Sequence, residues 1–122
     1  MASSSELTDL VMEQLTGFGL VLARSMFGGV GFFHHNLMFA LIAYDELYFK
    51  TDDQNRGQFE SENLQPFCYE SKGGKRSVMS YHQAPDRVIE DAGEMLIWAQ
   101  SGFAAALRAD NAKPLAKRKY QG

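Results

Sequence analysis

Four short apolar runs follow one another between residues 20 and 51, and each break between them is only two residues long. The runs are LVLARSMF, VGFFH, LMFALIA and ELYFKT. Two residues can join antiparallel strands in a hairpin, whereas parallel strands need a crossover of about a dozen residues or more. The centre of the chain therefore predicts an antiparallel sheet made of consecutive hairpins.

Helical patterns flank these strands. Leu7, Leu10, Val11, Gln14 and Leu15 recur at three- and four-residue spacing and predict an amphipathic helix that ends near Gly17. A short middle helix is expected in DDQNRGQFESENL, then two strands, PFCYES and RSVMSYH, and a closing helix in PDRVIEDAGEMLIWAQSGFAAALRA with Gly93 as its candidate break. This order predicts a two-layer α+β fold, with an antiparallel sheet and N-terminal, middle and C-terminal helices.

The glycines at the start of the sheet region favour a turn over a phosphate-binding loop. Such a loop stands between a strand and a helix, but here a strand follows. With Gly28 and Gly29 as the turn, Met26 would pair with Gly31 and Phe27 with Val30. Gly31 would leave a gap that a large neighbouring side chain fills, and Phe27 would be a core residue.

Further turns are expected at His35 and Asn36 and at Tyr44 and Asp45. These turns assign the apolar side chains to two faces of the sheet. One face would hold Phe33, Met38, Ala40, Ile42, Leu47 and Phe49, and the other Phe32, Leu37, Phe39, Leu41 and Tyr48. Because both faces are apolar, we expect either helices on both sides or a second copy of the chain on one side, which predicts a homodimer.

Few residues in the sequence suggest chemistry. His34 and His35 are neighbours on a strand, so their side chains would point to opposite faces and could not bind one metal ion. With a turn at Gly73 and Gly74, Cys68 would face Met79, opposite to His82, which predicts a buried, inert thiol. We therefore assign no catalytic residue, no metal ligand and no cofactor, and a small enzyme or ligand-binding domain has no supporting cluster.

The charge of the chain is unevenly distributed. Residues 112–122 carry Lys113, Lys117, Arg118 and Lys119 and no acidic residue, so the remaining eight basic and fifteen acidic residues give residues 1–111 a charge of −7. We expect a domain over 1–111 and a basic, disordered tail over 112–122, with a nucleic-acid arm as the alternative for the tail. An acidic domain argues against sequence-specific DNA binding by this chain alone.

Two further features predict a cytoplasmic location. Cys68 is the only cysteine, so it has no partner for an internal disulfide. The first residues, MASSSELTDLVMEQL, lack the basic start and apolar stretch of a secretory signal, and no apolar run is long enough to span a bilayer.

Four ordered segments resemble the N-terminal domain of the TfoX/Sxy proteins. They are RSMFGGVG, LMFALIAYDELYFK, PFCYESKGGKRSVMSYHQAP and EDAGEMLIWAQSGFAAAL, and the likeness extends over residues 15–109. The chain differs at two turns, where the family tends to have Asp-Gly and this chain has His35 with Asn36 and Tyr44 with Asp45. The loop length is kept, so the resemblance predicts the same fold in a single-domain member.

The resemblance implies a two-layer α+β fold similar to that of secretion chaperones. Family members with a further C-terminal domain regulate natural competence together with the cyclic-AMP receptor protein, and no catalytic residue is transferred from them. We expect a non-enzymatic regulatory or protein-binding module whose protein partner is a transcription factor such as that receptor protein. The alternative is a chaperone-like dimer that binds a segment of another protein. The motif that we single out as structural or interacting comprises Arg24, Met26, Phe27, Gly28, Gly29 and Gly31.

Overall fold

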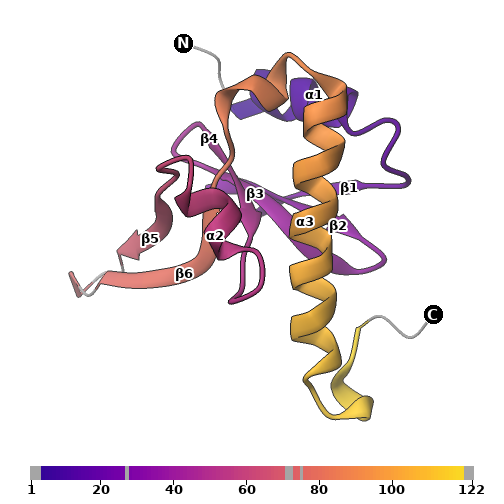
Figure 1. Cartoon of the computed structure of the whole chain (residues 1–122), viewed down its shortest axis with the longest axis vertical. Helices are drawn as coiled ribbons and strands as arrows, with labels where there is room; N and C mark the ends of the chain where they lie inside the picture. Colours follow the sequence, from indigo (N-terminus) through magenta and orange to yellow (C-terminus); the bar gives the residue numbers. More distant parts are fainter. Residues whose placement is uncertain (1–3, 27, 71–72, 75, 120–122) are drawn as a thin grey trace.

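The computed structural model describes residues 4–26, 28–70, 73–74 and 76–119, and it confirms the α+β prediction. The six strands form one antiparallel sheet in the order β1-β2-β3-β4-β6-β5 (Figure 1). The elements are α1 (Ser4–Gln14), β1 (Leu22–Met26), β2 (Gly29–His34), β3 (Leu37–Ala43), β4 (Glu46–Lys50), α2 (Arg56–Glu60), β5 (Pro66–Glu70), β6 (Arg76–Gln83), the 3-10 turn η1 (Asp86–Ile89), α3 (Ala92–Asn111) and the 3-10 turn η2 (Leu115–Lys117).

The helices lie on one face of the sheet, which we call the inner face. In Figure 1, α3 crosses in front of β2 and β3, and α1 lies near its first turns. The opposite side of the sheet is the outer face. The main core lies between the sheet and these helices, and its fully buried side chains include Val11, Leu15, Phe32, Phe39, Ile42, Phe49, Phe59, Val88 and Met95. Each of α1, α2, η1 and α3 therefore packs toward the inner face.

The two central hairpins turn where the sequence predicts. His35 and Asn36 have φ angles of 50° and 66°, and Tyr44 and Asp45 have φ angles of 54° and 61°. Two consecutive residues with positive φ form the type I′ turn, whose twist matches that of the flanking strands. The strand pairs on either side of these turns are therefore confirmed.

A bulge in the β2–β3 ladder makes part of the predicted face assignment wrong. Phe32 pairs with Ala40 but Phe33 pairs with Met38, so Phe39 is an extra residue in β3. Beyond a bulge, the alternation of side chains is shifted by one residue. As a result, Phe32, Leu37 and Phe39 join Ala40, Ile42, Leu47 and Phe49 in the inner core, while Phe33 and Met38 lie on the outer face with Leu41 and Tyr48.

The closing helical segment is divided, but not at Gly93. The 3-10 turn η1 ends at Ile89, and α3 begins at Ala92 after Asp91 as its N-cap. The Asp91 carboxylate accepts a hydrogen bond of 3.1 Å from the backbone N–H of Glu94. This cap satisfies an N–H group that has no partner within the helix, so the aspartate fixes where the helix starts.

The basic segment after α3 has local structure as far as Lys119. The Asp110 side chain is only 1% exposed, and its two carboxylate oxygens accept the backbone N–H of Lys119 at 2.9 and 3.0 Å. The turn η2 lies between these two residues. As far as Lys119, the segment thus folds back on the end of α3.

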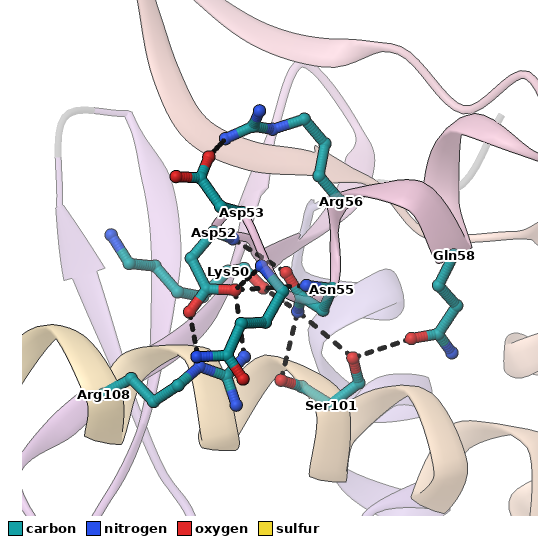
Figure 2. Close-up of polar contacts among 9 residues, drawn as sticks. Lys50, Asp52, Asp53, Asn55, Arg56, Gln58, Ser101 and Arg108 are labelled. Atoms are coloured by element: carbon teal, nitrogen blue, oxygen red, sulfur yellow. Dashed lines mark hydrogen bonds and ion pairs between the residues drawn. The ribbon is translucent and has the colours of Figure 1, made fainter.

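Four side chains join the β4–α2 connection to α3: Asp52, Asn55, Ser101 and Arg108 (Figure 2). We call this group the polar clasp. Arg108 donates two hydrogen bonds to Asp52, at 2.6 and 2.9 Å, and this pairing lowers the pKa of the Asp52 carboxyl. The Asn55 amide donates to the Lys50 carbonyl at 3.1 Å and to the Ser101 carbonyl at 3.2 Å, while its oxygen accepts the Asp52 N–H at 2.7 Å. The clasp therefore holds α2 and α3 at fixed positions.

We predict that Asn55→Ala lowers the free energy of unfolding by about 2 to 4 kcal/mol in urea denaturation. Asn55 is 7% exposed, so its loss leaves the part-buried carbonyl groups of Lys50 and Ser101 without this partner. The matched control is Asp53→Asn, which removes an ion pair to Arg56 from a side chain that is 91% exposed. The control should cost less than about 0.5 kcal/mol. Equal losses in the two variants would contradict a structural role for the clasp.

Candidate functional site

The first hairpin carries the motif singled out from the sequence, and its predicted register is wrong. Met26 pairs with Gly29, and Arg24 pairs with Gly31. Of the two glycines predicted to form the turn, Gly28 has a positive φ of 77° and Gly29 does not; Phe27 lies outside the described residues. Gly29 belongs to the strand because β3 approaches it closely: a Cβ atom there would lie 2.1 Å from the Ile42 carbonyl oxygen. Gly28 therefore supplies the turn conformation, whereas Gly29 allows β3 to approach closely.

The gap expected at Gly31 is present, and large side chains fill it. A Cβ atom on Gly31 would lie 2.6 Å from the Met26 sulfur, 2.8 Å from the Met38 sulfur and 3.1 Å from the Phe33 ring. Three flexible or aromatic side chains thus cover this glycine from β1, β2 and β3. Together they form the centre of an apolar surface on the outer face of the sheet.

We call this surface the outer patch. It comprises Leu22, Met26, Phe33, Met38 and Leu41. Leu22 is 48% exposed, and the other four side chains are half-buried. Beside it, Tyr48, Phe67 and Tyr81 form a small buried cluster against Met38 and Leu41. The outer face is therefore apolar but only partly shielded from water.

Charged groups lie along the border of the outer patch. The Arg24 guanidinium carbon is 5.1 Å from the centre of the Phe33 ring, and the Lys50 ammonium is 5.1 Å from that of Tyr81. Cations over aromatic faces are attracted by the ring quadrupole. Burial raises the pKa of Tyr81, so its hydroxyl stays protonated and donates to the Met38 carbonyl at 3.3 Å. An arginine beside aromatic and methionine side chains is a typical protein-binding composition.

The histidine pair differs from its prediction. The rings of His34 and His35 are 4.2 Å apart, because His35 lies in a turn where strand alternation no longer applies. The Nδ1–H of His34 donates to the Leu20 carbonyl at 2.6 Å, and Phe103 packs against both rings. The described ranges contain no group of three or more side chains suited to a metal ion.

Cys68 does not occupy its predicted position either. Cys68 pairs with Val78 instead of Met79, and its thiol is half-buried, not buried. His82 pairs with Pro66, four residues further along β6. The Nδ1 atom of its ring lies 2.9 Å from the Thr51 hydroxyl, and burial lowers its pKa. The imidazole is thus neutral near pH 7 and is held by a hydroxyl.

The structure also bears on membrane insertion. Among the helices that it describes, none combines the length and the apolar composition that crossing a bilayer requires.

We predict that Gly29→Ala lowers the free energy of unfolding by about 3 kcal/mol or more, measured in urea. The added methyl group would collide with the Ile42 carbonyl of β3, and a backbone oxygen in a central ladder moves only at high cost. Gly57→Ala is the matched control, because nothing lies within 4 Å of a Cβ atom there. It should be neutral or stabilising by about 0.5 to 1 kcal/mol, as alanine favours helix over glycine. Similar effects in both variants would refute the close approach.

A family model described as the TfoX N-terminal domain matches residues 13–106, a stretch that begins in the last turn of α1, includes the whole sheet and reaches into α3. None of the curated proteins matches the chain.

Proposed function

Because the chain belongs to the TfoX N-terminal domain family, we propose that it is a non-enzymatic module that regulates natural competence or transcription by binding a protein partner. The family is associated with competence regulation. We propose a transcription factor such as the cyclic-AMP receptor protein as the partner, and the cytoplasm as the location. The outer patch is the observation that supports this proposal most directly.

The composition of the outer patch supports protein binding over binding of a small molecule. Leu22, Met26 and Met38 offer flexible apolar contacts, and methionine-rich surfaces adapt to different partners. Arg24 lies over Phe33 in the same region. Exposed apolar surface with a cationic border is costly to leave in water, and a protein partner would bury it.

A second candidate is the chaperone-like homodimer, which the end of the sheet favours. β1 forms one edge of the sheet, and four of its five residues are exposed. An exposed edge strand can bind an extended segment of another protein through backbone hydrogen bonds. In that case a second copy of the chain would cover the outer patch, and β1 would receive the segment.

Site-specific photo-crosslinking separates these candidates. We predict that p-benzoylphenylalanine at Leu22, on the outer face, cross-links the chain to a transcription factor in its native cell, as identified by mass spectrometry. The matched control is the same label at Ile97, which is 53% exposed on α3, on the helical side of the sheet. An exported protein captured at Leu22 alone would favour the chaperone, and a cross-link to the chain itself would support the homodimer. Identical products from both positions would contradict binding through the outer patch.

We also predict that this chain alone does not recognise a DNA sequence. Residues 1–111 carry a charge of −7, so only the four basic residues after Asn111 favour a polyanion. In gel-shift titrations, binding should weaken with salt with a log–log slope of magnitude about four or less. Truncation before Lys113 should abolish it. A complex with one sequence that survives both this truncation and physiological salt would overturn the prediction.

A further inference from the structure

A cavity of about 450 Å³ opens between α2 and the β5–β6 hairpin, away from the outer patch. It arises where the β5–β6 ladder is irregular between Pro66 and Cys68, and proline has no N–H to donate to a neighbouring strand. Nearby, the chain leaves β4 after Lys50 and forms α2 from Arg56. The cavity volume lies within the range of about 300 to 1,000 Å³ that is common for small-molecule sites.

The floor of the cavity holds a polar pair that is almost completely buried. His82 is 5% exposed and Thr51 is 2% exposed, and the His82 Nδ1 atom is 2.9 Å from the Thr51 hydroxyl. The described residues give the second ring nitrogen of His82 no hydrogen bond. In that same part of the chain, no fully buried side-chain nitrogen or oxygen lacks a partner, so this nitrogen keeps some accessible surface on a residue that lines the cavity. The floor therefore offers one neutral hydrogen-bonding group to a ligand.

The rim carries two opposite charges. Arg56 and Glu60 stand four residues apart on α2, and both line the cavity. Arg56 forms its ion pair with Asp53 instead of Glu60. Between them and the floor, Leu64, Pro66 and Met79 provide apolar walls. A purely anionic ligand would be repelled by Glu60 and a purely cationic one by Arg56.

We propose that this cavity binds a free α-amino acid. The carboxylate of the ligand would pair with Arg56 and its ammonium group with Glu60, because a zwitterion matches a rim that carries both signs. The side chain of the ligand would contact Leu64 and Met79, and the open ring nitrogen of His82 would bond a polar atom at the bottom. The site is distinct from the outer patch, so it does not depend on the proposed partner.

The test uses the twenty proteinogenic L-amino acids as probes, each added singly to the full chain at about 10 mM. A ligand that binds only the folded state raises the melting temperature, and calorimetric titration then gives its dissociation constant. We expect at least one amino acid to bind. Its N-acetyl and carboxamide derivatives each lose one charge, so their dissociation constants should be higher by about tenfold or more.

Variants of the rim locate the site. Arg56→Gln and Glu60→Gln should each raise the dissociation constant by about tenfold or more, because each removes one charge-assisted hydrogen bond. The control Glu13→Gln changes the net charge as Glu60→Gln does, at an exposed position of α1, and should leave the constant unchanged. The outer-patch variant Leu22→Glu should also bind normally, which keeps this proposal separate from the proposed function. If no amino acid binds, or if both rim variants bind as well as the unmodified chain, the proposal is wrong.

Discussion

Gly102 brings α3 into direct contact with the sheet, and the rest of the structure depends on this approach. A Cβ atom at this position would lie 2.9 Å from the Phe39 carbonyl oxygen and 3.3 Å from Phe49, so a larger residue would push the helix outward. The neighbouring Ser101 and, further along, Arg108 then reach the polar clasp, which links α3 to the start of α2. Gly102 thus provides the close contact with the sheet, and Ser101 and Arg108 anchor an adjacent side of the helix. Because α1, α2 and α3 are all committed to the inner face, the outer face keeps its apolar residues without a covering helix.

The bulge at Phe39 determines which aromatic side chains lie on each face of the sheet. It turns Phe39 toward the inner core, where its ring stacks on Phe18 at 5.2 Å, and it places Phe33 on the outer face under Arg24. A regular ladder would have placed Phe33 on the inner side and Phe39 on the outer side. The outer patch is therefore produced by one extra residue in β3, since alternation alone would have given a different set of side chains.

The predictable features are those determined by neighbouring residues. Asn36 and Asp45 tolerate positive φ, so the turns and the order of the hairpins follow from the sequence, and with them the α+β class. Features that require distant partners could not be predicted. Asp52 and Arg108 are 56 residues apart, and the register at Gly29 depends on the approach of Ile42 in another strand. The cavity was missed for the same reason, because it lies between segments whose relative placement no local pattern specifies.

β6 connects the two surfaces that carry the proposals. Tyr81 points to the outer face, where its hydroxyl bonds the Met38 carbonyl, and the next residue, His82, points to the cavity and bonds Thr51. Since neighbouring side chains on a strand alternate, one short stretch of backbone positions a residue beside the outer patch and a residue of the cavity. Both residues are at least nine-tenths buried, so neither can move without disturbing packing on its own face. A substitution at Tyr81 or His82 would therefore disturb the packing of its own face, whereas Leu22 and Glu60 are exposed and allow each surface to be altered without that cost.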